Sequence, residues 1–314
     1  MKNLKNLKAH IANHAAAAIG FSTRNITNEK ILEILISKVF EPYLGWRDLE
    51  LSSKTAFGSN LKLTLPDSIQ TCIFLTGTWE PTTTKFVTST LKHGDIFIDI
   101  GANIGYYTVL ASKLVGNSGF VYSFEASPAI FKRLEENVIL NKITNAKIYN
   151  VAVSNRVGVT TIWTAPKGNL GHSTIIQRVA ENDGHSRETE IPCNTITAMM
   201  PRLEMLRARL IKIDIEGAER LAIEGIFPEL SKFSTQTEWL VELSPCFSPG
   251  GTKDIDWIFE TFRSADYFAY QIENIYAPLH SQRKSHKREL TKIQKPPSVP
   301  LSDIIFSKEK FRDQ

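Results

Sequence analysis

The hydrophobic positions of this chain change their spacing several times, and each change marks a different kind of element. From about residue 95, short apolar runs (DIFIDI, FVYSFE, KIYNVAV) alternate with amphipathic segments. This alternation is typical of βαβ units around a parallel sheet. Ser127 followed by Pro128 predicts a helix start, because serine can cap free N–H groups and proline suits the first helical position. The pattern therefore predicts an α/β protein.

The same alternation returns in the second half of the chain. LIKIDI, EWLVEL, YFAYQI and DIIF are strand-like, and helices are expected from about Ala218 to Ile226 and near Asp254 to Phe262. Between Val157 and Thr197 the spacing becomes a simple alternation broken by glycine and asparagine turns. This stretch predicts a β-rich insertion rather than a further βα unit, and insertions of this kind often shape a substrate site.

Residues 1–90 contain no strong chemical motif. Apolar residues recur at helical spacing from Ile31 to Phe40, and leucines alternate from Leu61 to Leu65 as they would in a strand. We therefore expect a helical and β-hairpin extension over residues 1–90, followed by one larger domain over residues 91–314.

Composition and charge narrow the choice of class and compartment. The 314 residues are 42% hydrophobic and carry a net charge of +4, which is too weakly basic to argue for a nucleic-acid partner. Cys72, Cys193 and Cys246 are odd in number and widely separated, which favours a reducing, cytoplasmic location. The short apolar run from Ala15 to Phe21 makes a poor signal peptide. No stretch approaches the ~20 apolar residues of a membrane span.

A basic stretch over residues 283–295 allows two interpretations. Its six cationic side chains precede the sequence PPSVP, and a solvated loop is the simpler explanation. The alternative is a positive rim that contacts a phosphorylated acceptor or an anionic membrane surface. The stretch consists of Arg283, Lys284, Lys287, Arg288, Lys292 and Lys295.

The segment DIGANIG, from Asp99 to Gly105, stands between a hydrophobic strand and a helix. Glycines there let the backbone approach a ligand where the helix N-terminus offers free N–H groups. A dinucleotide site would show GxGxxG, but Asn103 occupies the place of the second glycine. Asp99 would repel a pyrophosphate, whereas it can accept hydrogen bonds from a cationic, phosphate-free cofactor such as S-adenosylmethionine.

Glu125 ends the next strand, 20 residues beyond Gly105. A carboxylate at the tip of a second strand can accept hydrogen bonds from both hydroxyls of a ribose. The loop and this acid together are far more specific than either alone. The simpler alternative for Asp99 and Glu125 is helix capping or a surface ion pair.

The run LIKIDIEG places three charged residues on one side of a strand. Alternation puts Lys212, Asp214 and Glu216 on that side, and a lysine in a central strand needs a carboxylate partner, either Asp214 or Glu242. Asp214 and Glu216 emerge at the carboxyl edge of the sheet, where open α/β sheets bind their ligands. Both are therefore active-site candidates.

The motifs DIGANIGYYT, FEASP, IYNVAVSN, LIKIDIEGAE, LVELSP and DIIF together resemble the FkbM-type S-adenosylmethionine-dependent methyltransferases. The resemblance covers roughly residues 93–310. It implies a Rossmann-like seven-stranded class I methyltransferase sheet with the last two strands antiparallel to each other, and O-methylation of a sugar, glycan precursor or natural product. It also implies that Asn150 to Val153 lies near adenine. By the same likeness the cofactor is held by Asp99, Gly101, Asn103, Gly105, Glu125, Ala126 and Ala152.

Methyl transfer to a neutral hydroxyl benefits from a base that removes the proton. Asp214, Glu216 and His172 are the candidates, and His172 lies in a glycine-flanked part of the insertion where a loop could close over substrate. Asp214 and Glu216 could ligate Mg²⁺, but the sequence shows no third ligand, so no metal is assigned. Two rival functions remain: a nicotinamide-dependent oxidoreductase, and a non-catalytic scaffold that keeps the fold.

Overall fold

The computed structural model describes residues 49–272, apart from 167 and 183, together with 290–297, 301–311 and two isolated positions, 34 and 38. The helical spacing expected from Ile31 to Phe40 and the basic residues of 283–288 fall outside the described ranges.

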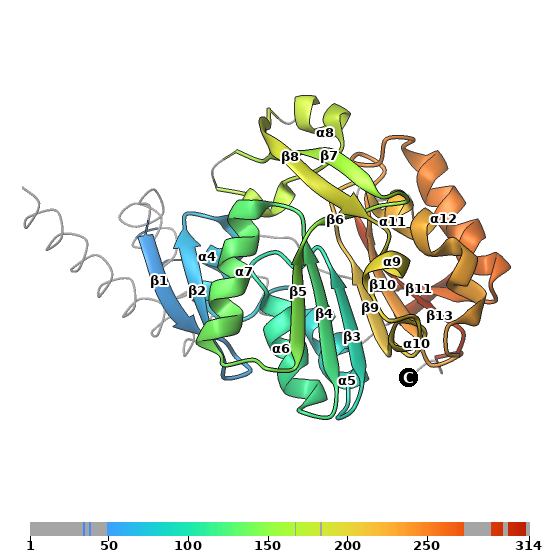
Figure 1. The fold of residues 1–314 in the computed structure, drawn as a ribbon, viewed down its shortest axis with the longest axis horizontal. Helices are drawn as coiled ribbons and strands as arrows, with labels where there is room; N and C mark the ends of the chain where they lie inside the picture. The colour runs from blue at the N-terminus through green and yellow to red at the C-terminus, as the bar shows by residue number, and fades with distance from the viewer. Residues whose placement is uncertain are drawn as a thin grey trace, which may run out of the picture.

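An eight-stranded mixed sheet forms the centre of the molecule (Figure 1). Its strands are β3 (Ile96–Ile100), β4 (Phe120–Glu125), β5 (Ala146–Asn150), β9 (Leu210–Ile213), β10 (Glu238–Leu243), β11 (Phe268–Ile272), β12 (Leu290–Ile293) and β13 (Ser302–Ser307). Their order is β12-β11-β13-β10-β9-β3-β4-β5. Strands β5, β4, β3, β9 and β10 are parallel, and β13 is antiparallel to both β10 and β11.

The seven strands expected from the resemblance are present, and the last two, β11 and β13, are antiparallel as expected. The eighth strand, β12, corrects the loop interpretation for one of the six basic residues, Lys292, because Leu290–Ile293 pairs with β11. An edge strand tolerates lysine, since its outer side remains in water. Lys292 is exposed there, with its ammonium 4.4 Å from the centroid of the Phe268 ring.

Alternating residues of the central strands bury the two faces of the sheet in two separate cores. Leu210 and Leu240 belong to one core, and their neighbours Ile211 and Val241 belong to the other. The first core is covered by α4 (Ser68–Thr76), α5 (Pro81–Thr90), α6 (Tyr106–Val115) and α7 (Pro128–Leu140). The second core is covered by α9 (Ile196–Met199), α10 (Arg202–Leu206), α11 (Glu219–Ile226), η3 (Phe227–Lys232) and α12 (Thr252–Ser264).

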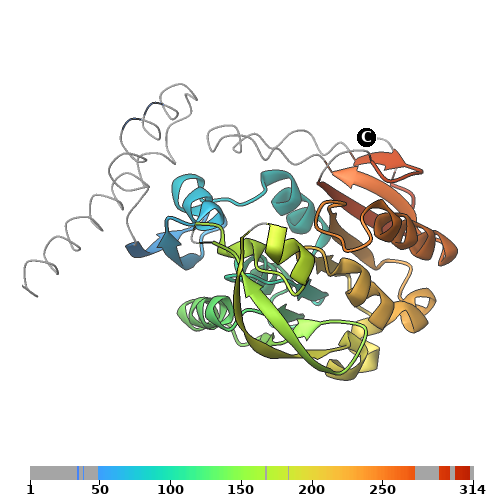
Figure 2. The same cartoon turned by 90° about the horizontal axis from the view of Figure 1, so that it is seen from above.

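The expected β-rich insertion is confirmed. A three-stranded sheet combines β6 (Ala152–Val153), which directly follows β5, with β7 (Gly158–Thr164) and β8 (Ser186–Asn194). Between β7 and β8 lie η2 (Leu170–His172) and α8 (Gln177–Asn182). Figures 1 and 2 show this small sheet lying across the carboxyl end of the main sheet. The insertion therefore covers the carboxyl edge of the main sheet, the edge at which α/β sheets bind ligands.

The expected hairpin is also present, as β1 (Leu49–Lys54) and β2 (Asn60–Leu65). The alternating leucines of β2 are fully buried and share a core with α6 and the main sheet. Asn137 of α7 and Asn141, the residue that caps this helix, form hydrogen bonds with the backbone of β2. Asn137 accepts a hydrogen bond from Lys62 N (2.6 Å) and donates to Ile104 O (2.8 Å). Asn141 bonds both backbone groups of Asn60.

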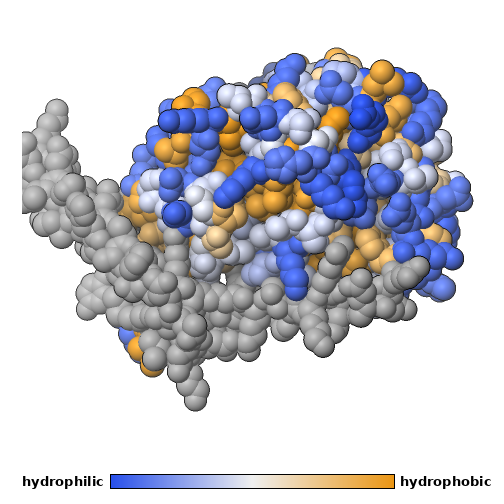
Figure 3. Space-filling model, turned by 90° about the horizontal axis from the view of Figure 1, so that it is seen from below, coloured by the Kyte–Doolittle hydropathy of each residue, from blue (hydrophilic) through white to orange (hydrophobic). Residues whose placement is uncertain are grey.

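The described surface has a mixed character. On the face seen in Figure 3, hydrophobic and hydrophilic residues are interspersed wherever described residues are visible. Among the described residues, no helix combines the length and the apolar character that crossing a membrane requires.

Replacing Asn137 with alanine is expected to lower the free energy of unfolding by about 2 kcal/mol, because the buried Ile104 carbonyl and the partly buried Lys62 N–H lose their hydrogen bonds to Asn137. Urea unfolding measures the loss. Asn141→Ala is the matched control, since its bonds to Asn60 are exposed to water, and it is expected to cost about 0.5 kcal/mol. Equal losses in the two variants would contradict this account of how the hairpin is anchored.

Candidate active site

One cavity lies at the carboxyl edge of the main sheet, beneath the insertion. Its walls come from the ends of β3, β4, β9 and β10, from the segment before α5, and from η2. Most of the sequence-predicted site residues meet there. Those that line the cavity are Gly101, Asn103, Glu125, Ala126, Ala152, His172, Asp214 and Glu216.

Glu125 is held firmly at the end of β4. It is 8% exposed, and its two oxygens accept hydrogen bonds from Asn103 N (2.8 Å) and Ser127 N (2.9 Å). Each carboxylate oxygen keeps a further lone pair for a ligand. Burial raises the pKa of Glu125 to about 7, although the two backbone N–H groups oppose this shift. The geometry suits a carboxylate that receives hydroxyl donors.

Gly101 brings the loop after β3 against the loop after β9. Its φ is +85°, and an added Cβ would lie 1.7 Å from the carbonyl oxygen of Asp214. Any other residue would force the two loops apart. The loop that carries Asn103 is thereby fixed relative to the acid at the end of β9.

Asp99 and Gly105 do not line the cavity. Asp99 is fully buried, and its Oδ2 accepts a hydrogen bond from Thr108 Oγ1 of α6 (2.8 Å). Gly105 is the N-cap of α6. The structure thus places both residues behind the loop rather than on its ligand-facing side. Asp99 thus contacts α6 through Oδ2, and its expected hydrogen bond to the cofactor stays a prediction.

The end of the cavity beside Glu125 is apolar. This end lies between the ends of β4 and β5 and the insertion. Of the described residues that line it, Glu125 alone has a charged side chain. Such a surface can receive the flat face of an aromatic base. The apolar residues are Ala126, Ile130, Val151, Ala152 and Ile162.

Lys212 is buried in β9, with 5% of its side chain exposed. Its Nζ lies 2.6 Å from Asp214 Oδ2, which confirms the expected pairing with an acid, and its backbone is in register with Asp99 on β3. Burial lowers the pKa of Lys212, but Asp214, Asp99 and Glu80 outweigh burial and hold that pKa above its usual value. Burial would likewise raise the pKa of Asp214, yet Lys212 holds it below its ordinary value.

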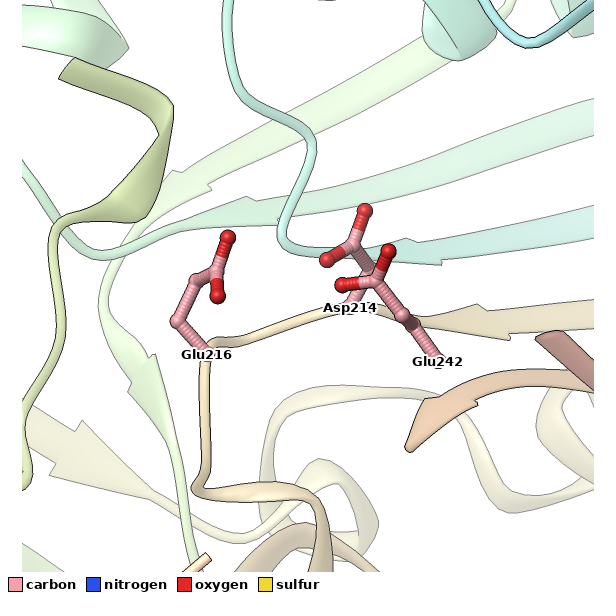
Figure 4. Close-up of side chains that lie close together, drawn as sticks. All are labelled: Asp214, Glu216 and Glu242. Atoms are coloured by element: carbon pink, nitrogen blue, oxygen red, sulfur yellow. The ribbon is translucent and has the colours of Figure 1, made fainter. Parts of the chain in front are cut away.

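Glu242 of β10 completes a group of three carboxylates with Asp214 and Glu216 (Figure 4). One oxygen from each lies within 4.8 Å of the others. Burial, with Asp214 and Glu216 nearby, raises the pKa of Glu242 well above its ordinary value. The third acid that the sequence did not reveal is therefore supplied by the neighbouring strand.

Glu216 sits on a tight loop with φ +52°. Glu219 holds this loop, because its Oε1 accepts hydrogen bonds from Ile215 N (3.2 Å) and Gly217 N (3.1 Å). Oε2 of Glu216 lies 3.7 Å from Nδ1 of His172, an ion-pair distance longer than a hydrogen bond. Burial, then Asp214, raises the pKa of Glu216 well above its ordinary value. The insertion thus places the His172 ring beside an acid of the loop that follows β9.

Several lining residues were missed in the sequence. Glu80 precedes α5, is 7% exposed, and accepts a hydrogen bond from the hydroxyl of Tyr107 (2.9 Å). Burial raises its pKa to about 8. Trp79 and Phe247 line the same region, and the ring centroids of Phe247 and His172 are 5.4 Å apart. None stands in a recognisable motif, and proline after Glu80 signals only a helix start.

The charges around the cavity fit a cationic cofactor. Its described lining contains one ammonium, that of Lys212, and five carboxylates. A pyrophosphate would be repelled by this set, whereas the sulfonium of S-adenosylmethionine would be attracted. The acids are Glu80, Glu125, Asp214, Glu216 and Glu242.

The strand order and the cavity together define a Rossmann-like α/β fold with a cofactor site at its carboxyl edge. Residues 99–269 match the model of the methyltransferase FkbM domain. The chain belongs to the FkbM methyltransferase family. The chain spans about 60% of the length of the Streptomyces and Beauveria relatives that it matches. Membership of this family favours a methyltransferase over the nicotinamide-dependent oxidoreductase.

Individual relatives are distant. The chain is 26% identical over 160 residues to 31-O-demethyl-FK506 methyltransferase FkbM of Streptomyces tacrolimicus, covering 43% of this chain and 61% of that protein. It is 22% identical over 146 residues to methyltransferase 1 of Beauveria bassiana, covering 42% and 58%. The crystal structure of methyltransferase FkbM from Methylobacillus flagellatus aligns with 12% identity and a TM-score of 0.41, covering 74% of this chain and 52% of the other.

Replacing Lys212 with methionine is expected to lower the free energy of unfolding by about 3 kcal/mol at pH 8, because it leaves buried carboxylates without their cation. The loss should be smaller at pH 6. Acids whose pKa is raised in the folded state take up protons on folding, so a lower pH favours the folded variant.

Urea unfolding at the two pH values tests this expectation. Lys147→Met, at an exposed position of β5, is the matched control and is expected to change stability by less than about 0.5 kcal/mol. A deficit in Lys212→Met that does not depend on pH would show that the ammonium is not what balances these acids.

Proposed function

We propose that this protein transfers the methyl group of S-adenosylmethionine to a hydroxyl oxygen of a small polyhydroxylated acceptor, such as a sugar, a glycan precursor or a natural product. The observation that supports this proposal most directly is a single cavity bounded by Glu125 on one wall and by His172 and Glu216 on another. The name of the Streptomyces relative, which specifies an O-demethyl natural product as its substrate, points to the same chemistry.

Glu125 accepts the ribose hydroxyls in this proposal, and the apolar end around Ala126 and Ala152 receives adenine. Gly101 and Asn103 shape the loop that passes beside the cofactor. When bound, S-adenosylmethionine supplies an electrophilic methyl group. The protein must then align the acceptor oxygen with that carbon, and holding two reactants in line accounts for a large part of such catalysis.

Of the three candidate bases, His172 fits best. Asp214 is a weak base, because Lys212 bonds it and lowers its pKa. Glu216 stands beside His172 and can stabilise the positive charge that the ring acquires. His172 would accept the proton of the acceptor hydroxyl as that oxygen bonds to the methyl group that S-adenosylmethionine would supply, and S-adenosylhomocysteine would be the leaving group. The 3.7 Å separation of the pair would shorten in a substrate complex.

We further propose that the reaction takes place in the cytoplasm. Cys72, Cys193 and Cys246 form no disulfide bonds. Free thiols are typical of proteins that work in a reducing compartment.

Calorimetric titration of S-adenosylmethionine tests the cofactor site. Micromolar binding is expected for the wild type, and Glu125→Gln should weaken it at least about tenfold, because hydrogen bonds to a charged acceptor are lost. The ionised carboxylate is the form that accepts two donors, so the Kd should rise about tenfold per unit below pH 7.

Glu125→Gln should abolish this pH dependence. Glu135→Gln, at an exposed position on α7, should bind like the wild type. An affinity that is unchanged in Glu125→Gln would remove Glu125 from the cofactor site, and the absence of binding by the wild type would overturn the proposed function.

Replacing His172 with glutamine tests the base. The rate of methyl transfer should fall about 100-fold, the lower range for the loss of a general base. The affinity for S-adenosylmethionine should stay within twofold. Single-turnover transfer from radiolabelled cofactor to a panel of sugars and polyols gives the rate. Replacing His93, an exposed histidine before β3 that does not line the cavity, with glutamine is the control. An undiminished rate in His172→Gln would exclude it as the base.

A further inference from the structure

The part of the cavity beyond the cofactor wall carries an excess of negative charge. Glu80, Asp214, Glu216 and Glu242 line it, and Lys212 is its one ammonium among the described residues. Lys212 is already engaged with Asp214 at 2.6 Å. Buried carboxylates that outnumber the cations beside them either take up protons or attract a positive ligand. Burial first, and then the neighbouring acids, raise the pKa values of Glu80, Glu216 and Glu242.

Three of these acids converge on one place. Figure 4 shows the carboxylates of Asp214, Glu216 and Glu242 turned toward a common region, with one oxygen from each within 4.8 Å of the others. Oε2 of Glu216 is buried and accepts no hydrogen bond from any described residue. Trp79 and Phe247 line the same cavity. Carboxylate oxygens that can accept hydrogen bonds, next to aromatic rings, suit a positively charged hydrogen-bond donor.

We propose that the acceptor carries a protonated amine one or two carbons from its reacting hydroxyl, and that Asp214, Glu216 and Glu242 receive this ammonium. The proposal rests on the proposed function, since it names the acceptor class of the same site. Glu216 lies between His172 and the other two acids, so an amino alcohol can present its hydroxyl to His172 and its ammonium to the three carboxylates. Acceptors with a phosphate or carboxylate at this point are repelled.

An ammonium fits the geometry better than a divalent metal ion. Three oxygens that accept from one tetrahedral nitrogen at about 2.8 Å lie about 4.6 Å apart, a spacing that the three acids allow. A metal ion on Asp214 would stand next to the Lys212 ammonium, which bonds the same carboxylate, and its double charge would double the repulsion. The existing contact between the Lys212 ammonium and the Asp214 carboxylate is of the same kind as the proposed one.

The same carboxylates decide which atom is methylated. An amine surrounded by acids keeps its proton, because nearby negative charge favours the charged form. A protonated amine has no lone pair, so it cannot attack the methyl carbon. The neighbouring hydroxyl, facing His172, remains the nucleophile. The amine therefore serves for recognition, and the product is an O-methyl ether.

The test uses related sugars that carry an ammonium, no charge or a phosphate, titrated calorimetrically into full-length protein saturated with S-adenosylhomocysteine in EDTA. Glucosamine, glucose and glucose 6-phosphate form one set, and the galactose and mannose compounds form two more. In at least one set the amino sugar should bind ten times more tightly than the neutral sugar, with the phosphate weakest. Glu242→Gln should remove this preference. Glu260→Gln, exposed on α12, is the matched control.

Equal affinity for amino and neutral sugars in every set, a preference for phosphate, or no binding of any amino sugar overturns the proposal. So does an amine preference that survives in Glu242→Gln. If added Mg²⁺ tightens neutral sugars and Glu242→Gln abolishes that effect, the carboxylates bind a metal instead. Thermal unfolding confirms that each variant is folded. The same preparations are titrated with S-adenosylmethionine, so failure of the proposed function and failure of the amine preference are seen separately.

Discussion

The structure depends on the buried pair of Lys212 and Asp214. An ammonium inside a central strand is costly, and the 2.6 Å contact with Asp214 offsets that cost. The same contact holds the pKa of Asp214 below its ordinary value, whereas burial, with the charge of Asp214 nearby, raises the pKa values of Glu216 and Glu242. Asp214 is therefore the weakest base among these three acids, which agrees with the proposal that His172 serves as the base.

Close backbone packing links the loop after β9 to the loop after β3. Gly101 packs against the carbonyl of Asp214, so neither loop can shift toward the other. Asn103, on the first loop, donates its N–H to Glu125 at the end of β4. Three adjacent strands are thus joined at their ends by a glycine contact and one hydrogen bond. The walls that we propose for the cofactor and the acceptor are therefore in direct contact.

The sequence predicted what is local or periodic. Strand alternation, the cap at Ser127 and the β-rich insertion are confirmed, because each follows from spacing within a few residues of the chain. Glu80 and the third carboxylate, Glu242, could not be assigned a site role from the sequence, because only the packing of α5 and the register of β10 bring them to the cavity. The orientation of Asp99 was missed for a similar reason, since a strand residue faces whichever helix packs on that side.

This division explains why the reaction class could be inferred from motifs while the acceptor could not. The cofactor wall is built from one continuous stretch between β3 and β6, whose glycines and acid stand at fixed spacing. The acceptor wall is assembled from four distant parts of the chain: the segment at Glu80, the insertion at His172, the loop at Glu216 and the end of β10. The selectivity that we propose for this wall depends on the summed charge of the four parts, which cannot be read from any one segment of the sequence. Recognition of the acceptor is therefore a property of the tertiary structure.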